Sequence, residues 1–222
     1  MDAEIIKYGQ HPDQQIEFYG SPRPDGKVIV LIHGGYWRAL FDCEHIRPLA
    51  VALAQAGYHI AIPEFRREAG NPDVSLEDLK AAMIKIDGAE LILLGYSSGG
   101  HLGLLIADLF PRVSTLIALA PVTNLAESQR LELGRGAVRE WLGTDSAARP
   151  NLDPMLLPPL KCRQIFIQGD RDERVPIEIT LNYIKYAASH GAEIEMVTLV
   201  GTTHFEMMQV PSPTFDAILA AL

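Results

Sequence analysis

Residues 89–108 read AELILLGYSSGGHLGLLIAD, and the spacing of their apolar residues changes part of the way along. An unbroken apolar run at 91–94 stops at a turn of small residues, after which apolar residues return at helical spacing. The pattern predicts a buried strand that turns sharply into a helix. Ser97 lies at the turn in the pattern G-x-S-x-G, where small neighbours permit the backbone that lifts a serine hydroxyl above a sheet. Ser97 is therefore the candidate nucleophile, and the alternative is a glycine-rich turn whose serine has no chemical role.

Length and composition are those of one soluble α/β domain. With 222 residues, 48% of them hydrophobic and 21% charged, the chain can bury one sizeable core. The formal net charge of −9 argues against a nucleic-acid partner, because the basic residues form no cluster beyond Arg66-Arg67. We find no secretory signal and no apolar run long enough to span a membrane, so we expect a cytoplasmic protein without a membrane partner.

No metal or organic cofactor is expected. Cys43 and Cys162 are the two cysteines, and they lack the paired spacing of metal ligands, which favours two reduced and partly buried thiols. The chain also lacks a dinucleotide fingerprint and a phosphate-binding Walker loop.

Strands alternate with helices along most of the chain, which predicts a mostly parallel sheet with helices on both faces. The segments 15–19 and 27–32 are expected to form an edge hairpin across a turn-rich connection. A helix over 75–86 is expected to begin with an acidic capping box formed by Ser75 and Asp78. The other expected strands are 59–63, 91–94, 113–120, 164–168 and 193–199, and the other expected helices are 45–56, the one after the Ser97 turn, 177–190 and one from about Ser212.

Residues 121–160 interrupt this alternation. The segment carries five prolines and only one convincing helical piece, at 135–142. Long irregular insertions in compact domains are commonly functional, so within the single domain 1–222 we expect this one to form a small cap over the active face. The alternative is a long surface excursion that does not contact the site.

A serine nucleophile needs a base within hydrogen-bond reach and a carboxylate that orients the base. In this kind of sheet the acid and then the histidine follow the nucleophile, in loops after the last two strands. His204 is the predicted base, because His190 lies at a helix end, where histidine serves as a C-terminal cap. Asp172 is the predicted acid, with Asp170 second and Glu173 third, although spacing alone does not separate the two aspartates. The two acidic residues that do not orient the histidine are expected to lie in a solvated loop, paired with arginines.

The third requirement is a set of backbone N–H donors for an oxyanion. Ser98 supplies one, because it follows the nucleophile. The HGGYW loop, which begins at His33, supplies the others, and we assign Gly35 and Tyr36 with Gly34 as a further candidate. His33 itself is expected to brace the loop through hydrogen bonds rather than to transfer protons.

Together HGGYW, GYSSGGH, the loop pattern GxxDxxVP and the final HFE resemble the α/β-hydrolase superfamily, in particular the arylformamidase (kynurenine formamidase) family and the neighbouring hormone-sensitive-lipase-like esterases. HGGYW is the most specific piece, since the related esterases carry a third glycine where this chain has Tyr36, and Trp37 then matches the formamidase form. The resemblance covers most of the chain and implies an α/β-hydrolase fold with a triad of Ser97, Asp172 and His204.

The resemblance also implies a serine hydrolase that cleaves a small N-formyl arylamine, such as N-formylkynurenine, through a formyl-enzyme. Trp37, Tyr36 and Phe205 are expected to line an aromatic substrate pocket, and the alternative is that they pack beneath the cap. One rival function is a carboxylesterase for short acyl esters, which needs the same triad. A rival of another class is a non-catalytic binding module, although such proteins usually lose a triad member. A small-molecule substrate is the expected partner, and the sequence leaves a homodimer open.

Overall fold

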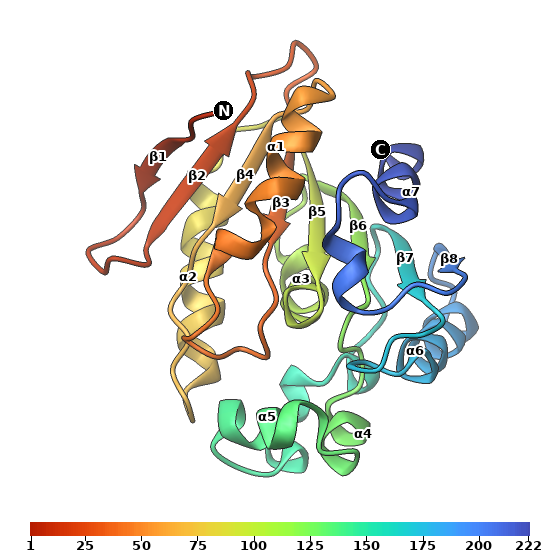
Figure 1. Ribbon diagram of the computed structural model, residues 1–222. Helices are drawn as coiled ribbons and strands as arrows, with labels where there is room; N and C mark the ends of the chain where they lie inside the picture. The colour runs from red at the N-terminus through yellow and green to blue at the C-terminus, as the bar shows by residue number, and fades with distance from the viewer.

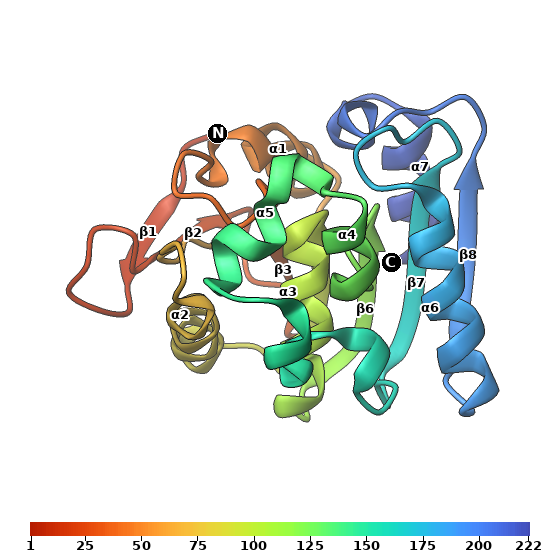
Figure 2. The ribbon, with the colours of Figure 1, turned by 90° about the horizontal axis from the view of Figure 1, so that it is seen from below.

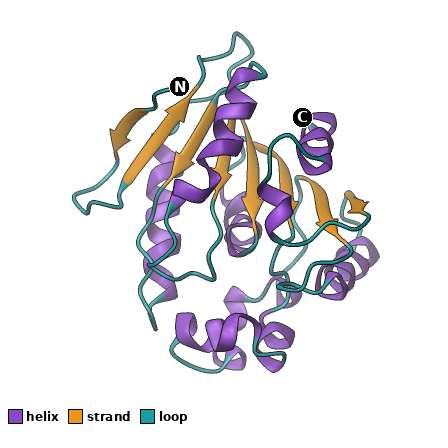
Figure 3. Cartoon of the chain, viewed as in Figure 1, coloured by secondary structure: helices purple, strands orange, loops and turns teal.

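The computed structural model describes residues 1–222 and contains one eight-stranded sheet flanked by helices (Figure 1, Figure 3). The strands are β1 (Glu4–Lys7), β2 (Gln15–Tyr19), β3 (Lys27–Ile32), β4 (Ile60–Pro63), β5 (Glu90–Tyr96), β6 (Val113–Leu119), β7 (Arg163–Gly169) and β8 (Ile194–Leu199). The helices are α1 (Arg47–Gln55), α2 (Pro72–Lys85), α3 (Ser98–Ile106), α4 (Leu125–Arg130), α5 (Leu133–Leu142), α6 (Ile177–Ser189) and α7 (Pro213–Ala221). None of these helices is both long and apolar enough to cross a lipid bilayer.

The sheet has the strand order β1-β2-β4-β3-β5-β6-β7-β8. The strands from β4 to β8 are all parallel, whereas β2 pairs antiparallel with both β1 and β4. This is the expected α/β architecture, and the parallel strands bring their carboxyl ends to one edge, where Figure 1 shows the arrows of β3, β5 and β7 ending together.

The sheet is buried on both faces, which explains why its strands are continuous apolar runs. In β3, Val28, Val30 and Ile32 belong to one core cluster with residues of α2, α3 and α6. Ile29 and Leu31 alternate with them and pack on the opposite face against residues of α1 and α7. Figure 2 shows these two groups of helices on opposite sides of the molecule.

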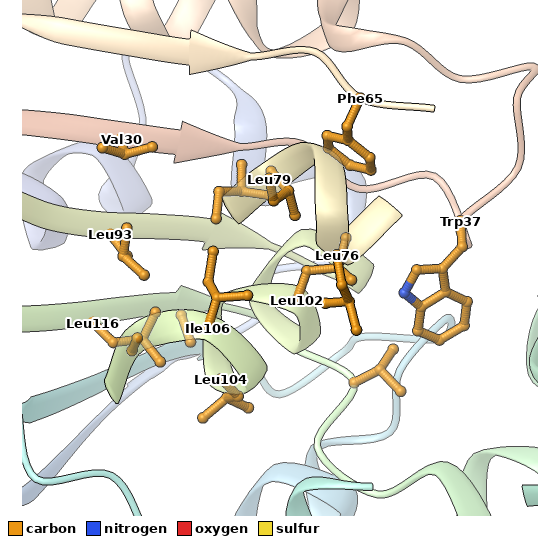
Figure 4. Packing of buried hydrophobic residues seen from close by; sticks show 14 of the residues in the cluster. Val30, Trp37, Phe65, Leu76, Leu79, Leu93, Leu102, Leu104, Ile106 and Leu116 are labelled. Atoms are coloured by element: carbon orange, nitrogen blue, oxygen red, sulfur yellow. The ribbon is translucent and has the colours of Figure 1, made fainter. Parts of the chain in front are cut away.

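Helix α3 is fixed to the sheet by its apolar face. Figure 4 shows Leu102 and Ile106 of α3, together with Leu79 of α2, beside the strand residues Leu93 and Leu116. All five side chains are buried. Each contributes on the order of 1.5–3 kcal/mol of burial free energy, so the start of α3 and the turn before it are held firmly against β5.

The expected edge hairpin between 15–19 and 27–32 is wrong. The two strands form as predicted, but β4 lies between them, and β2 pairs with β1 instead. The sequence did not indicate β1, because all four of its residues are exposed and it therefore lacks the alternation of a half-buried strand.

Helix α2 begins three residues earlier than predicted, and Ser75 and Asp78 do not form its cap. Pro72 occupies the first turn, where its missing N–H and fixed φ are tolerated. The Ser75 hydroxyl instead donates to the carbonyl of Arg66 (2.7 Å), and the Asp78 carboxylate accepts from the Arg66 backbone N–H (3.0 Å) and guanidinium (2.7 Å). The expected helix at 45–56 is also divided, because a 3₁₀ turn, Cys43–Ile46, precedes α1.

The 121–160 insertion contains two helices rather than one, α4 and α5, followed by three short 3₁₀ turns. Helix α4 has six residues, too few to show a helical period in the sequence. Figure 1 shows α4 and α5 beyond the carboxyl ends of the parallel strands. His101 of α3 joins the insertion to the rest of the fold, because its Nε2 atom lies 2.8 Å from the carbonyl oxygen of Leu152.

Candidate active site

Ser97 lies at the junction of β5 and α3 in a conformation that few L-residues adopt. Its φ of 55° and ψ of −120° store strain of about 1–3 kcal/mol. The Ser97 N–H donates to the carbonyl of Leu119 (2.8 Å), and the Ser97 carbonyl accepts from the N–H of His101 (3.2 Å). Gly99 permits the helix start to touch β3, because a Cβ there would lie 2.2 Å from the carbonyl oxygen of Ile32. The surrounding contacts therefore impose the turn that the sequence predicted.

A hydrogen-bond chain joins Ser97 to two residues that are distant in sequence. The Ser97 Oγ atom lies 3.1 Å from His204 Nε2, and His204 Nδ1 lies 2.7 Å from Asp172 Oδ2. An ionised carboxylate only accepts, so Nδ1 carries the proton and Nε2 of the neutral ring is free to accept from the serine hydroxyl. The three residues are 2%, 4% and 8% exposed. The structure thus brings together the predicted nucleophile, base and acid, with a histidine oriented to remove the hydroxyl proton.

The geometry separates the three candidate acids. Besides His204, Asp172 accepts hydrogen bonds from two consecutive backbone N–H groups, those of Arg174 (2.9 Å) and the next residue (2.8 Å). Asp170 is exposed and its carboxylate accepts from the N–H of Gly201 (2.6 Å), which fastens the loop that carries the histidine. Glu173 is exposed and reaches only the Arg174 side chain, at 3.8 Å.

Three unpaired backbone donors lie beside the serine. The N–H groups of Gly35, Tyr36 and Ser98 form no hydrogen bond within the protein. Gly35 and Tyr36 have φ of 120° and 53°, so the chain turns sharply there. The loop lies directly against the turn between β5 and α3, since a Cβ on Gly34 would be 3.0 Å from the Cβ of Ser97. The arrangement can stabilise negative charge that develops on an oxygen next to the serine.

His33 braces this loop, as predicted, and takes no part in the hydrogen-bond chain. Its Nδ1 atom lies 2.8 Å from the carbonyl oxygen of Gly34, and its Nε2 atom lies 3.2 Å from Glu64 Oε1. The buried Glu64 carboxylate also accepts from the N–H of Cys43 (2.7 Å) and pairs with Arg67. Burial would raise the pKa of Glu64, but the contacts with His33 and Arg67 outweigh it and hold that pKa well below its usual range. A buried charged cluster therefore anchors the base of the loop.

A pocket of about 580 Å³ opens above Ser97. Tyr36 and Phe205 contribute to its wall, as predicted. Several wall residues were not predicted from the sequence, because they come from five separate segments that only the folded chain brings together. Among them, only Tyr96 could have been placed near the site from the sequence, because it belongs to the G-x-S-x-G pattern around Ser97. The lining residues are Gly35, Tyr36, Arg38, Phe41, His45, Tyr96, Ser97, Gly134, Arg135, Arg174, His204, Phe205 and Met208.

Trp37 does not line the pocket, so its assignment to substrate binding is corrected. The side chain is only 4% exposed and stacks on Trp141 of α5, with ring centroids 4.6 Å apart and an interplanar angle of 12°. The left-handed conformation at Tyr36 and Trp37 directs the indole into the core, where Figure 4 shows it near Leu76 and Leu102. Trp37 therefore joins the loop to the 121–160 insertion, whose Gly134 reaches the pocket wall.

A second depression, of about 650 Å³, lies around Arg23, Lys27 and His59. Lys27 begins β3, so this depression is at the opposite end of the sheet from Ser97. It contains no hydrogen-bonded serine and histidine, and the structure holds no cluster of three or more His, Cys, Asp or Glu side chains placed to bind a metal. The hydrogen-bonded serine and histidine lie in the pocket above Ser97.

Comparisons with known proteins show which family and which fold this chain resembles. A model of the alpha/beta hydrolase family matches residues 29–171. Kynurenine formamidase of Danio rerio is 22% identical over 230 residues, covering 92% of this chain and 75% of that protein. Kynurenine formamidase of Debaryomyces hansenii is 26% identical over 144 residues, covering 60% of this chain and 49% of that protein. The crystal structure of esterase B from Lactobacillus rhamnosis has the same fold, with a TM-score of 0.82 and 18% identity over 99% of this chain and 84% of that one.

Proposed function

The chain belongs to the alpha/beta hydrolase family and is a hydrolase, and we propose that Ser97 is its nucleophile, His204 its general base and acid, and Asp172 the residue that orients His204. One observation carries this proposal: the hydrogen-bond chain of 3.1 Å and 2.7 Å that ends at the Ser97 hydroxyl. The three unpaired amides beside that hydroxyl support it, because acyl transfer needs donors for a tetrahedral oxyanion.

The proposed substrate is a small N-formyl arylamine of the N-formylkynurenine kind. The likeness to two proteins named kynurenine formamidase supports this choice, the first of them over 92% of the chain. The pocket volume of about 580 Å³ suits a small organic molecule. Tyr36 and Phe205 offer aromatic surface on which the arylamine ring can pack.

The proposed reaction proceeds in two acyl-transfer steps. Ser97 Oγ attacks the formyl carbon while its proton passes to His204 Nε2, and the amides of Gly35, Tyr36 and Ser98 hold the oxyanion. The intermediate collapses, the C–N bond breaks and His204 returns its proton to the departing amine. His204 then removes a proton from water, which attacks the formyl-enzyme ester. The bond between the formyl carbon and Ser97 Oγ then breaks, His204 returns its proton to Ser97 Oγ, and formic acid leaves and ionises to formate.

A carboxylesterase for short acyl esters is the second candidate. The same steps cleave an ester, with an alcohol in place of the amine, and the fold of esterase B matches nearly the whole chain. The two functions differ in the leaving group that the pocket accepts.

Hydrolysis of N-formylkynurenine and of p-nitrophenyl acetate, measured with the same protein, separates these functions. We expect a higher kcat/KM for the formamide, and a fall of at least about ten-thousandfold in kcat for both compounds in Ser97→Ala. Ser21→Ala, which makes the same change in an exposed loop outside the pocket, is the matched control. Cleavage of the ester alone would refute the proposed substrate. Full activity of Ser97→Ala would refute the assignment of Ser97 as the nucleophile.

A further inference from the structure

We infer that the pocket selects formamides whose leaving group carries a carboxylate, which Arg135 and Arg174 bind at the pocket rim. This inference rests on the proposed function and narrows its substrate class. A formyl group has one carbon and carries no ionisable substituent. Any charge on the substrate that the pocket recognises must therefore lie on the amine leaving group.

The pocket wall is positively charged, although the chain has a net charge of −9. Its lining includes three arginines and two histidines, and it includes no aspartate or glutamate. The arginine nearest the HGGYW loop, Arg38, is already neutralised by Glu140, at 2.6 Å. Arg135 and Arg174 therefore remain to interact with a ligand.

The Arg135 side chain forms no hydrogen bond and no ion pair within the protein. Its backbone is left-handed, with φ of 58°, between Gly134 and Gly136 at 60° and 81°. The turn is packed on the ring of Tyr36, since a Cβ on Gly134 would lie 2.8 Å from a ring carbon. The Arg135 side chain is exposed at the pocket wall, so its guanidinium is free to bind a ligand there.

Arg174 reaches the pocket from the opposite segment, the loop that contains Asp172. Its N–H donates to Asp172 (2.9 Å), and its carbonyl accepts from the Tyr36 hydroxyl (3.1 Å), so its backbone is fixed on both sides. The guanidinium lies over the Phe205 ring, 5.1 Å from the centroid. Its only acidic contact is with the exposed Glu173, at 3.8 Å. Tyr36 thus contacts both segments, through Gly134 beside Arg135 in the 121–160 insertion and through the carbonyl of Arg174 in the acid loop.

Arginine is suited to a carboxylate ligand, because its planar guanidinium donates two parallel hydrogen bonds to the two oxygens. An aryl ring packed on Tyr36 or Phe205 would place a ring carboxylate near these cations. The formamide itself would remain directed toward Ser97.

The test compares formanilide with 4-formamidobenzoate, which differ by one carboxylate. The carboxylate also changes intrinsic reactivity, so the measured quantity is the ratio of the two kcat/KM values, compared between protein variants. We expect the ratio of anionic to neutral substrate to fall about tenfold in Arg135→Gln and in Arg174→Gln, mainly through KM, which is the loss expected for one charge-assisted hydrogen bond. Arg135→Lys keeps the charge but loses the two parallel hydrogen bonds, so its ratio should lie between those of Arg135→Gln and the wild type.

Arg139→Gln is the matched control, because the substitution removes the same charge from the same helix. Arg139 lies outside the pocket, where it pairs with Asp145. Its ratio should equal that of the wild type. An unchanged ratio in both pocket variants would overturn the inference while leaving the proposed function intact. If the wild type cleaves no formamide, the proposed substrate fails, and the same ratio is measured with 4-acetoxybenzoate and phenyl acetate. An unchanged ester ratio in the pocket variants, or no turnover of either ester, then overturns the inference as well.

Discussion

Acid should destabilise the fold through His101, a histidine in α3 four residues after Ser97. The side chain is fully buried, with its Nε2 atom 2.8 Å from the carbonyl oxygen of Leu152 and its Nδ1 atom without a partner. The rings of Trp37 and Trp141 approach it edge-on at 5.1 and 5.3 Å. Burial lowers the pKa of His101 from 6.5 to about 4, and the hydrogen bond to Leu152 opposes this only in part.

The sign and size of the effect follow from this pKa. The unfolded chain binds a proton at His101 below about pH 6.5, whereas the folded protein binds one only below about pH 4. The free energy of unfolding is therefore greatest above pH 6.5 and decreases as the pH is lowered from about 6.5 to about 4. At about 1.36 kcal/mol per pH unit, the full loss is about 3 kcal/mol. A loss of this size is a large part of the stability of an ordinary domain, which is about 5–15 kcal/mol.

Urea unfolding at about pH 7 and about pH 4.5 measures this loss in the wild type and in His101→Gln, whose amide can still donate to Leu152. We expect the wild type to lose about 2–3 kcal/mol more than the variant between the two conditions. Carboxylates that titrate in the same range contribute equally to both proteins, so the difference isolates the histidine. Equal losses in the two proteins would show that His101 takes up a proton in the folded protein as readily as in the unfolded chain.

Two further substitutions test the site. Asp172→Asn should lower kcat by about ten-thousandfold with an unchanged circular dichroism spectrum, because it removes the acceptor that fixes the histidine tautomer, whereas Asp170→Asn should cost less than about tenfold. Equal losses in steady-state assays would contradict the choice of acid. Gly34→Ala should lower kcat by about a hundredfold or more, because its Cβ would lie 3.0 Å from that of Ser97 and displace the oxyanion loop. A variant that folds and retains the wild-type kcat would show that the loop amides do not hold the oxyanion.

The residues that the sequence predicted well are those whose local chemistry allows one arrangement. The strand-turn-helix around Ser97 needs small residues at fixed positions, and His204 is the one histidine after the last strand. The parallel strands were also evident, because burial on both faces makes them continuous apolar runs.

The parts that could not be predicted depend on tertiary contacts. Nothing in the spacing distinguished Asp172 from Asp170, since only the folded loop directs one toward the histidine and the other toward Gly201. Trp37 was expected to line the pocket because the HGGYW loop borders the pocket. The left-handed backbone at Trp37 instead directs its indole ring inward, onto Trp141 of α5. Arg135 and Arg174 were not predicted at the pocket either, because they lie in segments distant in sequence that meet only in the folded chain.

Covalent labelling of the nucleophile would show which serine reacts. The wild type, Ser97→Ala and Ser98→Ala would each be treated with an aryl phosphonate, digested and fragmented in a mass spectrometer to locate the adduct. We expect one adduct per chain, on Ser97, in the wild type and in Ser98→Ala, and none in Ser97→Ala. An adduct on another residue, or labelling that persists in Ser97→Ala, would show that Ser97 is not the nucleophile.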